Sequence, residues 1–311
     1  MMKNYNFVGN LKRALIISAA IMLVGVACLA IFGVKMDISF KGGTRVQYEY
    51  TEAPDLDKIE DVAEDVLDTD VKVTKEDGGK TKLVTLTLTK RIGAQKQAEL
   101  HTKLGKAAPQ LNTAKPYSAN TLSAAMGVKF LMRCLLALGL AAILLVIYVG
   151  FRFRKIGGYT AGVAALIALL HDLLIVFFTF VIFGIELNNN FVAVMLTILG
   201  YSLNDTIVIF DRVRTLRRRS DAPLADVVND SLHHVMRRTI ITTVTTCVAI
   251  LAVLIVALIM GINSIVSFAL PMLLGAVSGS YSSLFLSGPI WVKWMERREK
   301  KGDVRWKQPK R

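Results

Sequence analysis

The sequence predicts a membrane bundle of six transmembrane helices (all-α) with one small α+β domain between the first and second spans. Apolar runs of about 18 residues or more recur along the chain, a length that spans a bilayer as a helix. The chain of 311 residues is 53% hydrophobic but only 8% aromatic, which is more aliphatic surface than a soluble domain needs. Residues 35–128 interrupt this pattern with mixed charged and apolar sequence.

Six runs are long enough to cross the membrane. The first follows Lys12 and Arg13 and would also suit a signal peptide, but its about 20 apolar residues exceed the usual h-region of roughly 7–15. We therefore expect an uncleaved first span. The predicted spans are 14–34, 130–151, 159–184, 191–210, 239–261 and 262–291.

The same pattern divides the chain into four parts. They are the N-terminus with the first span (1–34), the α+β domain (35–128), spans two to six (129–291) and a basic tail (292–311).

Positive charge follows the pattern that sets membrane orientation. The net charge is +14, yet residues 35–128 contain 14 basic and 14 acidic residues, so the whole excess lies elsewhere. Basic residues gather at both ends and in alternate loops, such as 152–155 and 212–219, as cytoplasmic segments do. We expect both termini in the cytoplasm, residues 35–128 outside it, and contacts with membrane lipids but no nucleic acid partner.

Residues 35–128 predict the order βαββαβ, which is typical of a small ferredoxin-like domain. A strand opens at Phe40-Lys41-Gly42-Gly43-Thr44 and alternates over 45–50. Gly42 and Gly43 suit either a recognition loop or a tight approach of the backbone beside the membrane. The other predicted elements are helices 55–67 and 94–108, a hairpin of 71–76 with 83–89, and a last strand at 111–117.

Asp205 is the residue on which the functional prediction depends. It lies seven residues before Arg212, which opens a basic loop, and therefore roughly 10 Å inside the hydrocarbon. A charge at such a position costs on the order of 2.5–3.5 kcal/mol, so it marks an ion path, a proton relay or a buried ion pair.

A cation on the next span can pair with Asp205. Arg238 begins the predicted fifth span, and its long side chain can bend inward. Protonation of Asp205 would release Arg238, so the pair is a candidate two-state element driven by protons. A static ion pair that locks two helices is the alternative. Supporting polar positions are Tyr201, Ser202 and Asn204 on the fourth span and Thr242 and Thr246 on the fifth.

A second acidic residue, Asp172, lies midway along the third span beside His171. A His/Asp pair suits a proton shuttle, but neighbouring helical residues point about 100° apart and should not face a common ligand. Asp172 shares a face with small residues that let helices approach closely, and its buried role stays open. Those residues are Ala161, Ala165 and Ala168.

Motifs of soluble and membrane enzymes are missing from the sequence. It contains no His-Glu-x-x-His, Gly-x-Ser-x-Gly or Walker-type Gly-x-x-x-x-Gly-Lys pattern, so we expect no enzyme, no cofactor and no metal site. The membrane gradient is then the available energy source, since a proton crossing 100 mV yields about 2.3 kcal/mol.

Several of these segments together resemble the SecF family of protein-export membrane proteins, within the SecD/SecF family, which is related to the resistance-nodulation-division transporters. The longest matching segment is Gly200–Arg214, and the resemblance covers nearly the whole chain. The other matching segments are Phe40-Lys41-Gly42-Gly43-Thr44, His171-Asp172, Arg238-Thr239-Ile240 and Tyr281-Ser282-Ser283.

The resemblance implies an accessory subunit of the Sec translocase in the bacterial inner membrane. Such proteins are thought to use proton flow with SecD, beside the SecYEG channel, to help emerging secreted polypeptides leave. By motif match, Asp205 is the proton-linked carboxylate and Arg238 its partner, with a SecD carboxylate completing the site. Two alternatives stay open: a proton-driven small-molecule or lipid exporter subunit, and a purely structural translocase scaffold.

Overall fold

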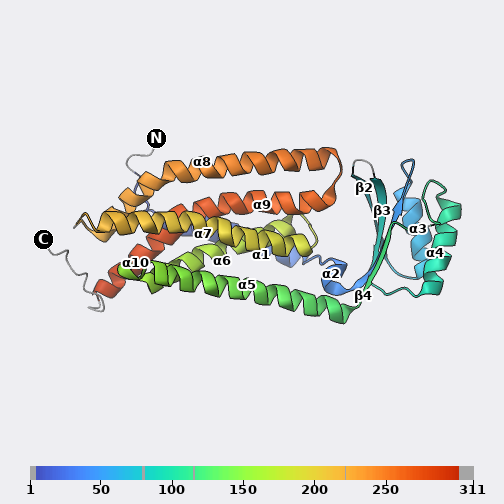
Figure 1. Ribbon diagram of the computed structural model, residues 1–311, viewed down its shortest axis with the longest axis horizontal. Helices are drawn as coiled ribbons and strands as arrows, with labels where there is room; N and C mark the ends of the chain where they lie inside the picture. The colour runs from blue at the N-terminus through green and yellow to red at the C-terminus, as the bar shows by residue number, and fades with distance from the viewer. Residues whose placement is uncertain (1–4, 79–80, 115, 221, 301–311) are drawn as a thin grey trace.

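The computed structural model describes residues 5–78, 81–114, 116–220 and 222–300. A long bundle of helices carries a four-stranded sheet at one end, and two further helices cover the far side of that sheet (Figure 1).

Six helices in the described residues are long and apolar enough to cross a membrane, as predicted. The sixth is not uniform, because a π-helical turn interrupts it and a further helix continues from that turn. The six are α1 (Leu11–Phe32), α5 (Ala124–Arg152), α6 (Gly158–Ile182), α7 (Asn189–Arg217), α8 (Leu224–Ile259) and α9 (Asn263–Ser282), the last continuing through η2 (Ser283–Ser287) into α10 (Gly288–Lys300).

The bundle is built around α6, which packs against α1, α5, α7 and α9. Small residues make these contacts close: Ala161, Ala165 and Ala168 are buried on α6. On α9, a side chain added at Gly279 would lie 3.1 Å from the Cβ of Ser202 on α7. By contrast α1, α5 and α8 expose most of their apolar side chains, as a surface facing lipid does.

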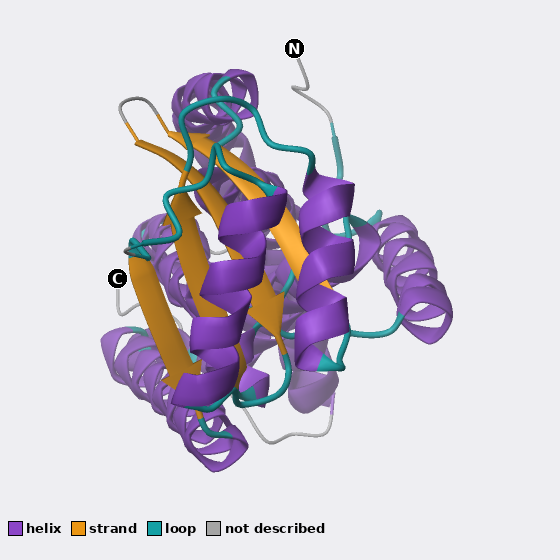
Figure 2. Cartoon of the chain, turned by 90° about the vertical axis from the view of Figure 1, so that its right-hand side faces the viewer, coloured by secondary structure: helices purple, strands orange, loops and turns teal. Residues whose placement is uncertain are grey.

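The sheet lies in the chain between α1 and α5. Its four strands are antiparallel in the order β2-β3-β1-β4, and two helices cover one face (Figure 2). Alternation along the strands buries Val46, Tyr48 and Leu86 against these helices. The elements are β1 (Gly43–Glu49), α3 (Leu56–Leu67), β2 (Val71–Gly78), β3 (Thr81–Leu88), α4 (Ala94–Ala107) and β4 (Ser118–Leu122).

The other face of the sheet is polar and turned toward the bundle. A cavity of about 440 Å³ lies between them, lined by the sheet and by the loops between the membrane helices. Two ion pairs line this cavity: Arg45 of β1 with Asp37, and Lys72 of β2 with Glu186 in the loop before α7.

Two predictions for the sheet region were wrong. Residues Ile38–Lys41 form a helical turn, α2, because the Asp37 side chain accepts a hydrogen bond from the Ser39 amide and caps it. The last strand is Ser118–Leu122 rather than the predicted 111–117, in whose described residues Leu111 forms an isolated bridge with Tyr50. The strand β4 is polar and mostly exposed, so it carries no hydrophobic alternation to detect.

At the opposite end of the bundle the helices run beyond the apolar segments that predicted them. Helix α8 begins at Leu224, well before the fifth span that was predicted at 239–261. Helix α10 reaches Lys300 and buries Trp291 and Met295, so residues 292–300 are no separate tail. The remainder of the predicted tail lies outside the described residues.

Candidate functional site

Two aspartates lie inside the bundle on neighbouring helices, Asp172 on α6 and Asp205 on α7. The Asp172 side chain is fully buried and that of Asp205 is 9% exposed. Charged carboxylates are costly at such positions unless they find partners, so their surroundings decide what each can do.

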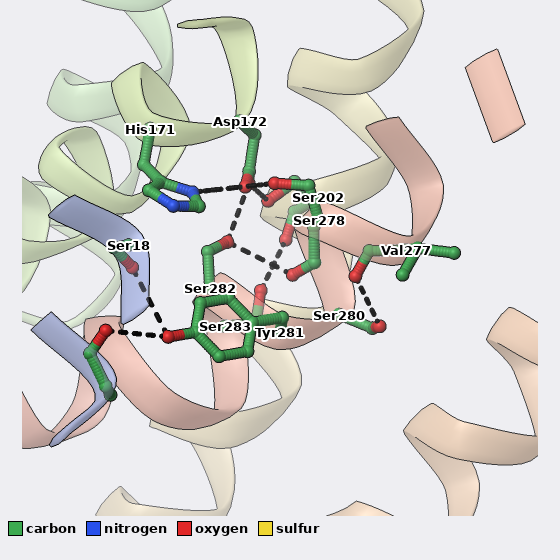
Figure 3. A network of polar contacts seen from close by, with 12 residues as sticks. Ser18, His171, Asp172, Ser202, Val277, Ser278, Ser280, Tyr281, Ser282 and Ser283 are labelled. Carbon is green, nitrogen blue, oxygen red and sulfur yellow. Dashed lines mark hydrogen bonds and ion pairs between the residues drawn. The ribbon is translucent and has the colours of Figure 1, made fainter. Parts of the chain in front are cut away.

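Asp172 is surrounded by hydroxyl groups from two other helices (Figure 3). Ser202 of α7 and Ser282 of α9 each donate to Oδ2 at 2.6 Å, and Ser278 of α9 donates to Oδ1 at 2.6 Å. Ser278 and Ser282 are one helical turn apart, so both reach the same carboxylate. The sequence placed Ser202 in support of Asp205, but its hydroxyl is bonded to Asp172 instead.

His171 takes part in the same cluster, contrary to the expectation that adjacent residues diverge. Its Nδ1 lies 3.2 Å from Asp172 Oδ1, because the side chains bend toward each other from neighbouring positions. Its Nε2 is buried and has no hydrogen-bond partner among the described residues. The ring lies 5.9 Å from that of Tyr281, whose hydroxyl donates to the Ala14 carbonyl of α1.

Asp205 has no comparable set of partners. Its Oδ2 is buried and unbonded, and within the described residues no ion pair joins it to Arg238, which is exposed on α8. The ion pair predicted from the sequence is therefore not formed in this conformation. The helices α7 and α8 are joined nearby through Tyr201, whose hydroxyl donates to Thr243 at 3.4 Å.

The other predicted polar residues lie on or near the outer surface of α7 and α8. Asn204 and Thr242 are exposed, and Thr246 is half-buried. Thr242 donates to carbonyl groups of its own helix at 3.0 Å, so it needs no partner from elsewhere. Asn204 and Arg238 offer polar groups at the outer surface of membrane-length helices.

Gly42 and Gly43 fit the tight-approach interpretation rather than a recognition loop. Both are buried with positive φ, +80° and +142°. A Cβ at Gly42 would lie 2.4 Å from the Ala124 amide nitrogen, and one at Gly43 2.3 Å from the Leu88 carbonyl oxygen. These glycines let the start of β1 pack against the start of α5 and against β3.

No site role was predicted from the sequence for Ser278 and Ser282, or for the two hydroxyls that extend the cluster. Thr206, next to Asp205, lies 3.0 Å from Ser283, whose hydroxyl donates to the Ser202 carbonyl at 3.2 Å. The repeat of serine at 278 and 282 was the available signal. Among the described residues, no group of three or more His, Cys, Asp or Glu side chains is placed to hold a metal ion.

Comparison with known proteins gives consistent matches. The family model described as protein export membrane protein SecD/SecF, C-terminal, matches residues 103–297. A protein translocase subunit SecF from Alicyclobacillus acidocaldarius is 33% identical, over 92% of this chain and 91% of its own length. A protein translocase subunit SecDF from Bacillus subtilis is 31% identical over 96% of this chain, which spans 39% of that protein.

Similarity extends to a solved structure. The crystal structure of SecDF from Thermus thermophilus, described as a translocon-associated membrane protein, aligns with a TM-score of 0.78 at 25% identity. The alignment covers 94% of this chain and 39% of that one, so this chain corresponds to part of the longer protein. With its six apolar helices, the chain is a multi-pass membrane protein that belongs to the SecF family of SecD/SecF protein export membrane proteins.

Proposed function

We propose that this protein is an accessory subunit of the Sec protein translocase that uses proton flow to promote the export of secreted polypeptides. The translocase role is supported by relatives named SecF and SecDF over most of the chain. The use of protons rests on Asp205 and its surroundings.

The unbonded, buried oxygen of Asp205 is the observation that carries the proton proposal. A carboxylate in a membrane bundle needs a proton or a cation. Arg238 attracts Asp205 electrostatically, but among the described residues it forms no ion pair with it. Arg238 lies on the adjacent α8 and has no ion-pair partner among the described residues. Proton exchange at Asp205 would then alternate between a neutral acid and a carboxylate paired with Arg238, and this change moves α7 relative to α8.

SecD is the proposed partner on the side of α7 and α8. In the SecDF relatives, a segment like this chain is fused to further sequence that makes up the larger part of the protein. Exposed polar groups such as those of Asn204 and Arg238 need polar partners at membrane depth, because lipid tails offer none. A carboxylate of SecD can complete the Asp205 site in the same way. Lipids would surround the apolar surfaces of α1 and α5.

The sheet region, residues 35–128, is proposed to be an extracytoplasmic ferredoxin-like domain that grips and releases emerging polypeptides near SecYEG. The element order and the strand order β2-β3-β1-β4 support that class. The basic loops support an inner-membrane protein with both termini in the cytoplasm, spans two to six within 129–291 and a basic end after 292.

The test replaces Asp205 with Asn in cells that lack the native protein and follows export of a secreted precursor by pulse-chase. Asp211→Asn is the matched control, because Asp211 lies on the same helix but is half-exposed and paired with Arg152 and Arg214. We expect precursor to accumulate only with Asp205→Asn, at normal membrane levels of both variants. Normal export with Asp205→Asn would support the structural scaffold instead.

A further inference from the structure

We propose that Asp172 and His171 form a second proton-binding site, separate from Asp205, whose protonation changes the hydrogen bonds that hold the π-helical turn η2. The binding of a proton at this site does not depend on the function proposed for Asp205; only its use in export does.

The charge balance around Asp172 points to a proton. No lysine or arginine of the described residues forms an ion pair with this fully buried side chain. Among the described titratable groups, His171 on α6 itself contacts the carboxylate, and Tyr281 on α9 contacts the His171 ring. Asp205 on α7 is not hydrogen-bonded to it, and α1 brings Ser18 and the Ala14 carbonyl to Tyr281. Within the part of the chain that the structure describes, the charge of the carboxylate is therefore balanced only by a proton on Asp172 or on His171.

The hydroxyl groups fit both protonation states. With Asp172 ionised, each serine gives its single hydrogen to the carboxylate, and His171 Nδ1–H gives another. On protonation, the Nδ1 hydrogen of His171 passes to Asp172 Oδ1, and a proton from water binds Nε2 of the same ring. The new O–H then donates to Ser278 Oγ, and the Ser278 hydrogen turns to the freed Nδ1, which lies 3.5 Å away. Only O–H and N–H bonds are made or broken, and the proton is exchanged with water.

The Nε2 atom of His171, which has no hydrogen-bond partner among the described residues, is an independent sign that this site exchanges a proton. Without a hydrogen this atom lacks a donor, and with a hydrogen, in the neutral or the charged ring, its N–H lacks an acceptor. Each assignment leaves a buried polar atom unsatisfied, which costs about 1–3 kcal/mol. A site of this kind is not held in one state by its hydrogen bonds.

Protonation would be transmitted through Ser282. Its hydroxyl has a second acceptor 3.2 Å away, the Gly279 carbonyl of its own helix, and turns to it when Asp172 becomes a weaker acceptor. Ser282 directly precedes η2. Short π-helical segments are frequent at functional sites, and a serine bond to the carbonyl of the preceding turn often bends a helix. The first residue of η2, Ser283, contacts Thr206 beside Asp205. The two aspartates are thus linked through α9.

The test is the infrared difference spectrum between neutral and acidic pH of the full-length protein in lipid bilayers. We expect acidification to produce a carboxylic acid C=O band that is lost in Asp172→Asn and kept in Asp205→Asn and Asp211→Asn. Ser278→Ala and Ser282→Ala keep Asp172 but remove donors, so each should shift the frequency of that band.

Spectra of wild type and Asp172→Asn that coincide across the pH range of the folded protein would overturn the proposal. If Asp172→Asn does not fold, a band unaffected by both serine variants would overturn it equally. Normal export with Asp205→Asn contradicts the proposed function but leaves this spectrum unchanged, so the two failures are distinguishable.

Discussion

The two buried aspartates, Asp172 on α6 and Asp205 on α7, are in opposite situations. Asp172 accepts hydrogen bonds from three serines of α7 and α9 and contacts His171, all within this chain. Toward α8, Asp205 keeps an unbonded oxygen, and Arg238 remains exposed. The carboxylate satisfied by its own chain contributes to folding, whereas the unsatisfied one depends on a proton or a partner.

The largest effect on stability is expected from Asp172→Ala. It leaves three buried hydroxyls and His171 without their common acceptor, at a cost on the order of 3 kcal/mol. Thermal unfolding of the purified protein in detergent would show a clearly lower Tm. The matched change, Asp205→Ala, removes a carboxyl with an unbonded oxygen and should leave the Tm nearly unchanged. Equal losses in the two variants would remove the distinction between the two aspartates.

A smaller effect on stability is expected from adding a methyl group where α9 packs closely against α7. In Gly279→Ala the new Cβ would lie 3.1 Å from Ser202 Cβ, so α9 and α7 must separate slightly and stretch the bonds to Asp172. We expect a loss of about 1 kcal/mol in the free energy of unfolding.

Gly200 provides the control for this change. It lies on α7 with nothing within 4 Å of an added Cβ, so Gly200→Ala should leave stability unchanged or raise it by up to about 1 kcal/mol. A greater loss in the free energy of unfolding from Gly200→Ala than from Gly279→Ala would contradict a close contact between α9 and α7 at Gly279.

The smallest expected effect is a pH dependence outside the membrane helices. In the sheet region, His101 Nδ1 lies 2.8 Å from the Tyr48 hydroxyl, and burial lowers the pKa of His101 below its usual 6.5. As the pH falls below about 6.5, the unfolded chain binds a proton that the folded chain does not, so stability declines. The Tm of wild type should fall on acidification relative to that of His101→Gln; parallel curves would contradict this.

The sequence was sufficient for the parts of the fold that depend on apolar length. Six spans, and the helices and hairpin of the sheet region, follow from hydrophobic periodicity. The polar edge strand Ser118–Leu122 and the helical turn Ile38–Lys41 do not, because one is set by pairing with β1 and the other by the Asp37 cap. The ends of α7, α8 and α10 were also missed, since these segments are amphipathic rather than uniformly apolar.

The site was only partly predictable for a related reason. The sequence identified Asp172 and Asp205 as buried acids, because any carboxylate in a span is unusual. It could not assign Ser202 to Asp172 rather than to Asp205, since that choice depends on which face of α7 packs against α9. The contacts of Ser278 with Asp172 and of Ser283 with Thr206 follow only from how the helices pack together.

The most direct measurement of the role of Asp205 is the effect of a proton gradient on export into inverted membrane vesicles at constant ATP. The vesicles would contain wild type, Asp205→Asn or Asp211→Asn at equal levels. We expect the gradient to accelerate completion of export with wild type and Asp211→Asn but not with Asp205→Asn. Full acceleration with Asp205→Asn would contradict a proton-linked role for this carboxylate.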